Sequence, residues 1–383
     1  MKQQAKKRLK IRIYKMIQKT SNRILKLKLF ISLVFLVVIV LIFWQQSQPE
    51  LVEKYYSTRF YPGVRTGLQF IFNPIPFSFG DLLYILLSLA IFISTFKFLK
   101  TFFIQKRLMD GAKIALNMII SLEVLMLIFY LFWGLNYFRQ PAAERLKLNG
   151  YEYSKEDLYK MTGILIDSAN STRSKINPEQ WPQTDPELYL ESAKAIKKLH
   201  PPYDAAIYPI PKIKNSLIGN LMNYFGTAGY FNPFTGEAQI NSGMPIYMRP
   251  FVACHETAHS MGYGAEDEAN FIGFISASES ENPMLRYSAY YLAAQEFMFE
   301  TGRLDTVVFQ TLKSRISKPF MADLKNERAY WEEYKGITRR FSNIFYDNYL
   351  KANKQPDGMK TYNRMIILTM TYYKKRGLLT PPD

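Results

Sequence analysis

The chain has 383 residues, of which 48% are hydrophobic and 15% aromatic, and its formal net charge is +17. This length suits one or two domains with accessory segments, and the single cysteine, Cys254, excludes an internal disulfide. Eleven of the Lys and Arg residues lie within residues 1–28, which contain no Asp or Glu, so the rest of the chain carries only +6 (17 minus 11). A basic arm directly before an apolar run is typical of cytoplasmic anchoring at a membrane, and we therefore expect no nucleic-acid partner.

Three apolar runs within the first 140 residues predict three membrane-spanning helices, at about 29–45, 82–104 and 114–135. The first run follows a long basic stretch and no small-x-small site comes after it, which favours a retained anchor over a cleaved signal peptide. The second and third runs could instead form a buried hairpin of a soluble domain, but their length favours membrane spans. We therefore predict that the lipid bilayer is a partner of this chain.

The distribution of basic residues predicts the orientation of these spans. Residues 1–28 are strongly basic, and the short link between the second and third spans contains Lys106, Arg107 and Lys113. Because basic residues are retained on the cytoplasmic side, we expect a cytoplasmic arm at 1–28, a transmembrane region at 29–138 and an extracytoplasmic domain at 139–383.

Two features of the third run need an explanation. Glu123 lies near its middle, where a carboxylate is costly unless it is paired or protonated. We hypothesise a structural pair with Lys97 on the neighbouring span; a transport role would rest on Glu123 alone. The residues from Trp133 to Tyr137 resemble an aromatic belt at the membrane interface.

The chain becomes polar and mostly helical from Gln140 onwards. Helix starts are predicted at Ser154 and at Asp185, and the second helix should end near His200, before two prolines. Residues 203–249 are rich in Gly, Pro and Asn and predict loops with short strands. After residue 282 helical patterns dominate again. We expect a mainly α fold with a small β element in this domain.

The segment from Arg249 to Gly262 predicts one helix, with Pro250 in its first turn and Gly262 as its C-terminal stop. His255 and His259 are four residues apart, so they lie on one helix face and could bind one metal ion together. Glu256 could reach a water molecule on that ion and act as general base. A chance His-Glu-x-x-His on an ordinary helix is the alternative, and the neighbouring sequence favours a metal site.

A zinc site of this kind needs a third protein ligand. Glu266 begins a second predicted helix, and the glycines at 262 and 264 provide the reversal that returns it to the first. Asn270 is the i+4 partner of Glu266 and could orient a neighbouring histidine. Glu266 is therefore the preferred third ligand, and Glu268 is the alternative.

These motifs resemble the gluzincin class of zinc metallopeptidases, in which H-E-x-x-H is followed by a helix reading E-x-x-A-D or E-x-x-A-N. The metzincin pattern fails, because Ala265 stands where its third histidine would be. The layout is also similar to a family of bacterial multi-pass membrane proteins catalogued as a domain of unknown function. This similarity rests on the segments 74–81, 232–239 and 349–353, and it implies a bacterial inner-membrane location with a periplasmic, zincin-like α+β domain.

The expected function is a membrane-anchored peptidase that cleaves a peptide or protein substrate with zinc-activated water. One Zn²⁺ per chain is expected, held by His255, His259 and Glu266, with Glu256 as the catalytic base. A catalytically silent protein of the same fold, acting as a binding or scaffold module, is the alternative. An intramembrane protease is disfavoured because the motif does not lie in a long apolar helix. Endo- and exopeptidase activity both stay open.

Other residues near the motif have less specific interpretations. By the same resemblance, residues 235–242 would form an edge strand that pairs with an extended substrate, and Glu237 within it is expected to be solvated. Cys254 is expected to be a small packing residue. Tyr263, Tyr287 and Tyr290 lie within sequence reach as oxyanion donors, but a core or surface role is expected for each.

Overall fold

The computed structural model describes residues 2–149, 152–176, 185–199, 211–355 and 363–377. The chain divides into two compact units, Met1–Gln45 with Leu83–Leu131 and Gln46–Leu82 with Phe132–Asp383. His200, expected at a helix end, lies outside the described residues.

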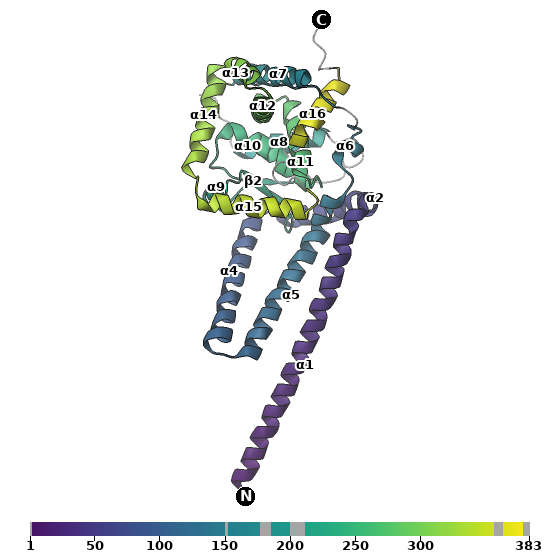
Figure 1. Ribbon diagram of the computed structural model, residues 1–383, viewed down its shortest axis with the longest axis vertical. Coiled ribbons are helices and arrows are strands. Elements are labelled where there is room, and N and C mark those ends of the chain that lie inside the picture. Colours follow the sequence, from purple (N-terminus) through teal and green to yellow (C-terminus); the bar gives the residue numbers. More distant parts are fainter. Residues whose placement is uncertain (1, 150–151, 177–184, 200–210, 356–362, 378–383) are drawn as a thin grey trace. The chain divides into compact units, whose positions relative to one another are not determined.

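The first unit contains long apolar helices. They are α1 (Lys2–Trp44), α4 (Phe79–Leu99), which the π-helical segment η3 (Lys100–Ile104) extends, and α5 (Leu108–Phe132). A short link joins α4 and α5 into a hairpin (Figure 1). The stretches Asn22–Ser47, Phe79–Ile104 and Leu108–Phe132 are long and apolar enough to cross a membrane, which confirms three candidate membrane-spanning helices at the predicted places.

The hypothesised pair between Glu123 and Lys97 is wrong. Ser32 donates a hydrogen bond from Oγ to Glu123 Oε1 over 2.8 Å, and no ion pair joins Glu123 to Lys97 in the described part of the chain. The reason is depth. Lys97 precedes the turn of the hairpin by about nine residues and Glu123 follows it by about seventeen, which offsets them by roughly 12 Å along the helix axes.

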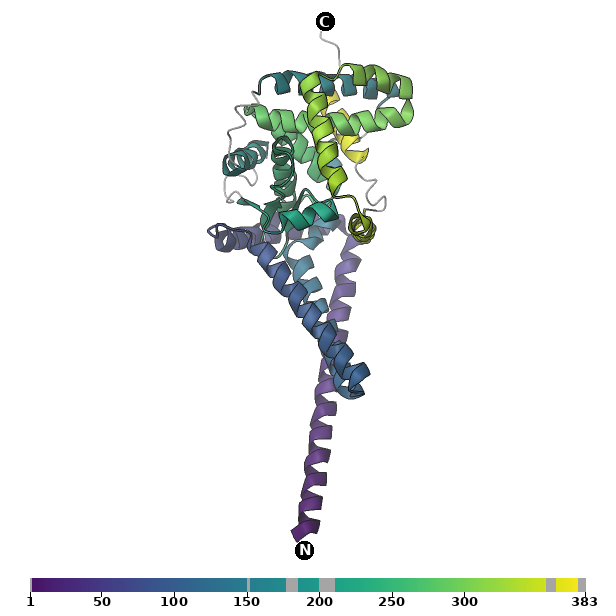
Figure 2. The same ribbon diagram turned by 90° about the vertical axis from the view of Figure 1, so that its left-hand side faces the viewer.

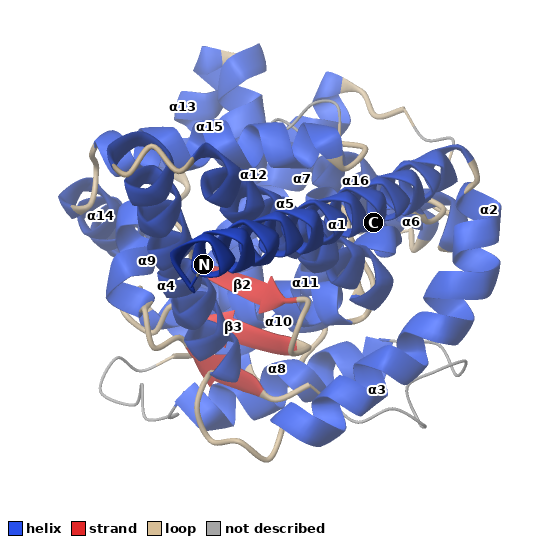
Figure 3. Ribbon diagram, turned by 90° about the horizontal axis from the view of Figure 1, so that it is seen from below, coloured by secondary structure: helices blue, strands red, loops and turns tan. Residues whose placement is uncertain are grey.

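The second unit contains a small three-stranded sheet with the order β1-β3-β2. The strand β1 (Ile213–Asn215) runs parallel to β3 (Glu237–Ile240), and β2 (Gly229–Asn232) runs antiparallel to β3. Figure 3 shows the strands in red beside α10. The segment 235–242 was expected at the edge of the sheet, which is wrong: β3 is its central strand.

Glu237 on β3 is buried, so the expectation that it is solvated is also wrong. It forms an ion pair with Lys214 on β1, and it accepts a hydrogen bond from the backbone amide of Gly80 over 2.7 Å. A buried carboxylate needs such partners. Here one comes from the neighbouring strand and the other from the segment 46–82.

The second unit contains further helices. In chain order they are η1 (Gln45–Ser47), α2 (Pro49–Leu51), η2 (Val52–Phe60), α3 (Tyr61–Phe72), η4 (Gly134–Phe138), α6 (Ala142–Arg145), α7 (Lys155–Ser174), α8 (Asp185–Leu199), α9 (Gly219–Phe225), η6 (Ile246–Met248), α10 (Arg249–Ser260), α11 (Glu266–Ser278), α12 (Pro283–Leu304), α13 (Thr306–Ser314), α14 (Lys318–Glu333), α15 (Ile337–Ala352) and α16 (Asn363–Lys375).

Local sequence signals explain several of these boundaries. Ser154 accepts a hydrogen bond from Asp157 N, and the Asp157 side chain returns one to the Ser154 backbone, so a capping box begins α7. The N-cap side chains of α12, α13 and α14 accept hydrogen bonds from backbone amides in the first turn; they belong to Asn282, Asp305 and Ser317. The predicted helix start at Ser154 is thereby confirmed, and Asp185 is the first residue of α8 among the described residues.

The helix α10 lies at the centre of this unit. It packs against α8, α11 and α12 on one side and against β2 and β3 on the other. Further out, α7 and α12 lie alongside each other (Figure 2). The side chains of α10 and α11 are almost all buried, so the motif residues lie inside a packed core. A mainly helical domain with a small sheet is confirmed.

Candidate metal centre

The two histidines of the motif are brought together by α10. Pro250 occupies the first turn of the helix, and Gly262 ends it with a φ of 82°, a conformation that favours glycine. His255 and His259 lie one turn apart on the same face, and their Nε2 atoms are 3.1 Å apart. The predicted helix and its boundaries are confirmed.

Glu266, the first residue of α11, reaches both histidines. Its Oε2 atom lies 3.3 Å from His255 Nε2, and its Oε1 atom lies 3.4 Å from His259 Nε2. Gly273 permits this approach of α11 to α10, because a Cβ there would lie 3.1 Å from the backbone nitrogen of His255. The structure thus brings together the three side chains that the sequence analysis selected as ligands.

Glu268, the alternative ligand, points elsewhere. Its Oε1 atom accepts a hydrogen bond from Ala142 N over 2.6 Å, and its Oε2 atom lies 3.0 Å from Arg145 Nη2. The two carboxylate oxygens are therefore bound by the first and the last residue of α6. Of the two carboxylates, only Glu266 faces the histidines.

A backbone carbonyl has the role that was expected of Asn270. His259 Nδ1 lies 2.7 Å from the carbonyl oxygen of Tyr263. Since a carbonyl only accepts hydrogen bonds, the proton is on Nδ1 in the neutral ring, and Nε2 keeps its lone pair for a metal. Among the described residues, no hydrogen bond joins Asn270 to either histidine.

Glu256 lies beside the same cluster, next to the edge strand β2. It is 5% exposed, and its carboxylate offers an oxygen within 4.8 Å of ligand atoms of His255 and His259. The backbone amide of Phe231 donates a hydrogen bond to Glu256, and burial raises the pKa of this carboxyl although the two histidines oppose the rise. A Cβ at Gly229 would lie 3.0 Å from Glu256 Oε1, so glycine there leaves room for this carboxylate.

The electrostatics of the cluster couple His259 to Glu266. Burial alone would lower the pKa of His259, but the Glu266 carboxylate outweighs it and raises that pKa to about 9. Burial likewise disfavours the ionised form of Glu266, yet His259 and His255 hold its pKa well below the usual value. Without a metal ion, the two groups therefore form an ion pair.

Two residues that the sequence analysis missed support Glu266 from the C-terminal part of the chain. The Tyr346 hydroxyl on α15 donates to Glu266 Oε1 over 2.8 Å, and Gln355 Oε1 accepts from Glu266 N over 3.2 Å. They lie about 80 and 89 residues beyond Glu266 in the chain. The sequence signal nearest to them is the segment 349–353, which was noted for its resemblance to the membrane-protein family.

The C-terminal end of α10 is capped by residues that adjoin the predicted spans. Trp133 Nε1 donates to His259 O over 2.7 Å, Tyr61 OH donates to Ser260 O over 2.6 Å, and Arg139 Nη1 donates to Gly262 O over 2.9 Å. Tyr61 supplies a partner for a carbonyl at the helix end, and Trp133 adds a second donor to the His259 carbonyl, which also accepts from Gly262 N over 2.9 Å. Trp133 is buried, so its expected place in an aromatic belt is wrong: its indole packs edge-on against His259.

The tyrosines considered as oxyanion donors have other partners. The Tyr287 hydroxyl donates to Asp323, the Tyr290 side chain is hydrogen-bonded to Tyr373, and the Tyr263 ring lies beneath the Arg145 guanidinium. Core roles are confirmed for Tyr287 and Tyr263, which are buried. Cys254 is fully buried, as expected of a packing residue.

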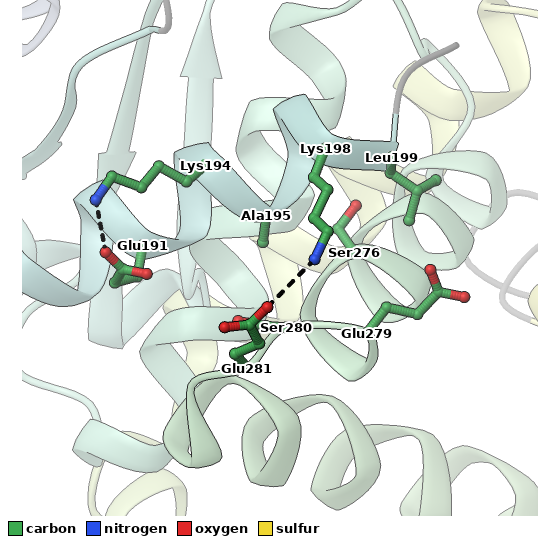
Figure 4. Close-up of a pocket in the computed structure, with 9 residues that line it drawn as sticks. All are labelled: Glu191, Lys194, Ala195, Lys198, Leu199, Ser276, Glu279, Ser280 and Glu281. Atoms are coloured by element: carbon green, nitrogen blue, oxygen red, sulfur yellow. Dashed lines mark hydrogen bonds and ion pairs between the residues drawn. The ribbon is translucent and has the colours of Figure 1, made fainter.

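A surface pocket between α8 and the end of α11 is separate from this cluster (Figure 4). Its lysines are paired inside it, Lys194 with Glu191 over 2.9 Å and Lys198 with Glu281 over 3.5 Å. None of the residues selected as ligands lines it.

The fold and the site define a mainly helical chain with three helices that could cross a membrane and a cluster of His255, Glu256 and His259 that could hold a metal ion. The family described as "Protein of unknown function (DUF3810)" matches residues 56–370, and the chain belongs to this family. This agrees with the expected resemblance to a family of unknown function. The matched range includes the residues that cap α10. No curated protein and no solved structure matches the chain.

Proposed function

We propose that this protein is a membrane-anchored, zinc-dependent peptidase. The observation that carries the proposal is the spacing of His255, His259 and Glu266. The two histidine Nε2 atoms are 3.1 Å apart, Glu266 Oε2 lies 3.3 Å from His255 Nε2, and Glu266 Oε1 lies 3.4 Å from His259 Nε2. Bonds of about 2.0–2.2 Å at tetrahedral angles place zinc ligands roughly 3.3–3.6 Å from one another. These spacings are close to those around one tetrahedral ion, and a Glu266 that binds through one oxygen would leave the fourth position open.

The neighbouring groups support hydrolysis rather than a purely structural site. Bound zinc would act as a Lewis acid that makes a water molecule acidic near neutral pH. Glu256 would take that proton and pass it to the leaving amine. Its burial raises its pKa, which strengthens it as a base, and the Phe231 amide holds it in place.

The edge strand β2 is the proposed place for the substrate backbone. In the described sheet, β2 pairs with β3 on one side only, and Glu256 lies beside it. An extended peptide could add along the side of β2 that faces away from β3, where the Phe231 amide donates to Glu256. Substrate pairing is thus proposed at residues 229–232 and not at 235–242.

Metal analysis of the full chain, purified in detergent, tests the zinc site. About one zinc per wild-type chain is expected, with loss in His255→Ala and in Glu266→Ala. Glu268→Gln should keep the metal, because its side chain faces Arg145 and Ala142. No zinc in a folded wild-type chain supplied with the ion would overturn the proposal.

A peptide-library screen then tests catalysis. Wild type should cleave peptides, and Glu256→Gln should keep its zinc while losing most of the cleavage, because a general base contributes about 10²–10⁴-fold. Zinc binding without cleavage by wild type would favour the catalytically silent binding module.

We also propose that the N-terminus is cytoplasmic and that the second unit is extracytoplasmic, in a bacterial inner membrane. The support is the basic arm and the basic link between the second and third spans. The only cysteine is buried, so an introduced exposed cysteine reports its side of the membrane. Gln310→Cys should react with a membrane-impermeant maleimide in intact cells, and Gln105→Cys only after permeabilisation. The reverse pattern would invert the topology.

A further inference from the structure

The helix α15 has an apolar outer face. Ile337, Phe341, Ile344 and Phe345 are 72%, 65%, 53% and 75% exposed. Their spacing of four, seven and eight residues places them along one stripe of the helix. The other side of α15 points inward, since Tyr346 reaches Glu266.

The neighbouring helix α9 extends this apolar surface. Figure 1 shows α9 and α15 side by side. Leu217, just before α9, and Leu221 and Tyr224 within it are each at least half exposed. Exposed apolar side chains gathered on two neighbouring helices are typical of a contact with a partner or a membrane. We call these residues of α9 and α15 the apolar face.

Residues on or beside the two helices that carry the apolar face form hydrogen bonds with residues at the end of each of the three predicted spans. Lys354, just after α15, donates to the carbonyl of Gln46, which lies two residues beyond the end of α1, in the last residues of the first candidate span. Tyr349 OH lies 3.2 Å from Tyr137 OH, five residues after the third span.

At its other end the apolar face is hydrogen-bonded to the first turn of the second span. Leu217 N donates to Asp81 Oδ2 over 2.6 Å, and Asp81 lies in the first turn of α4. If the spans cross a bilayer, their ends lie at its boundary. Each of these residues lies within a few positions of a span end, and consecutive Cα atoms are only about 3.8 Å apart, so each must lie near that boundary. The apolar face must then lie close to the same boundary.

The charge around α15 agrees with an anionic lipid surface. Residues 335–354 contain five Lys or Arg and one Asp, a net charge of +4 (5 minus 1). Basic residues beside an apolar helical stripe are typical of helices that lie in the interface plane.

We infer that α9 and α15 lie in the bilayer interface, with the apolar face among the acyl chains and the basic residues against anionic headgroups. The inference does not depend on peptidase activity. It places the metal cluster one helix away from the lipid, because Tyr346 on the inner side of α15 donates to Glu266.

Lipid contact can be tested with a matched pair of labelled positions in the full chain. Phe345 and Val307 are both apolar and both 75% exposed, but Val307 lies on α13, which packs on α12 and α7. Phe345→Cys and Val307→Cys would each carry the environment-sensitive dye NBD, in nanodiscs of phosphatidylcholine and phosphatidylglycerol. Ile344→Cys is a second outward position, and circular dichroism checks the fold of each variant.

At positions 345 and 344 we expect blue-shifted NBD emission and loss of most of the fluorescence when the nanodiscs contain doxyl-labelled lipid. Position 307 should show neither effect. Water-like emission at 345 and 344 would overturn the inference. Blue-shifted emission that doxyl lipid does not quench would also overturn it, because a second copy of the chain would then cover the face. Weaker signals in pure phosphatidylcholine would support the role of the basic residues, and equal signals would overturn that role.

Discussion

At the scale of single residues, the metal cluster is held together by charge even without an ion. His259 and Glu266 form an ion pair, because the carboxylate raises the pKa of the histidine to about 9 and the histidines lower the pKa of the carboxyl. A metal would replace the proton on His259 Nε2 and bind the same atoms. The cluster is thus pre-organised for a cation.

This electrostatic coupling predicts proton release on metal binding. At pH 7 His259 is protonated in the metal-free protein, and its Nε2 must lose that proton to bind zinc, so about one proton per ion should be released. The affinity for zinc should rise as the pH increases from 7 to 9, and the proton that His259 contributes should no longer be released well above pH 9. Calorimetry in buffers of different ionisation enthalpy measures the number of protons. No release at pH 7 would mean that His259 is neutral there.

Tyr346 is predicted to position Glu266. Tyr346→Phe removes the hydrogen bond to Oε1 and should weaken zinc binding by about 10–100-fold, as is usual when a partner of a metal ligand is lost. Competition with a chelator measures this affinity. The control is Tyr349→Phe, three residues further on, whose hydroxyl contacts Tyr137 instead. Equal losses in both variants would contradict a specific role for Tyr346.

At the scale of elements, the site depends on the close approach of α11 to α10. His255 and His259 are placed by the helical period alone, but Glu266 reaches them only because α11 returns against α10. The reversal requires the positive φ of Gly262, and the approach requires the missing side chain at Gly273.

Gly273→Ala is therefore predicted to destabilise the protein and to weaken metal binding. Its methyl group would lie 3.1 Å from the backbone of His255, which cannot move independently of α10, and overpacking of this kind costs about 1–3 kcal/mol. Denaturant unfolding and zinc competition measure the two effects. Gly63→Ala on α3 is the control, since nothing lies within 4 Å of its added Cβ; it should leave zinc affinity unchanged. An unchanged midpoint in Gly273→Ala would refute the packing argument.

At the scale of the whole molecule, segments that adjoin the predicted spans complete the core around the site. The compact unit that holds the cluster includes Gln46–Leu82 and Phe132–Asp383. Three side chains from the parts of this unit next to the predicted spans donate hydrogen bonds at the end of α10: Tyr61, Trp133 and Arg139. The backbone amide of Gly80 donates to the buried Glu237. The site therefore requires more of the chain than the part that follows the spans.

A fragment of residues 140–383 is accordingly predicted not to fold into a metal-binding domain. It lacks all three caps of α10, and each buried carbonyl left unsatisfied costs about 1–3 kcal/mol, against a total stability of about 5–15 kcal/mol for a typical domain. Size-exclusion chromatography and metal analysis compare it with the full chain. A soluble, zinc-loaded fragment would contradict the prediction. In the full chain, Tyr61→Phe should lower the free energy of unfolding by about 1–2 kcal/mol.

The features that could be predicted from the sequence are those set by neighbouring residues. The three spans follow from hydropathy, the capping of α7 from Ser154 and Asp157, and the facing of His255 and His259 from the helical period. The choice of Glu266 also came from a local pattern. These depend on contacts within a few turns of one helix or one reversal, so the order of residues is enough.

Only the tertiary structure decided which distant residues support these local features. Trp133 was expected at a membrane interface, but its indole packs edge-on against His259. Glu237 was expected in solvent, but it is buried in an ion pair with Lys214. Tyr346 had no local signal, because its partner Glu266 lies 80 residues away. Such contacts depend on how the whole chain packs. A side chain of a given type, such as tryptophan, can lie either at a lipid interface or in a protein core, so its type alone does not predict its place. The sequence therefore determined the spacing of the candidate ligands on α10 and the apolar helices, and the tertiary structure decided what surrounds them.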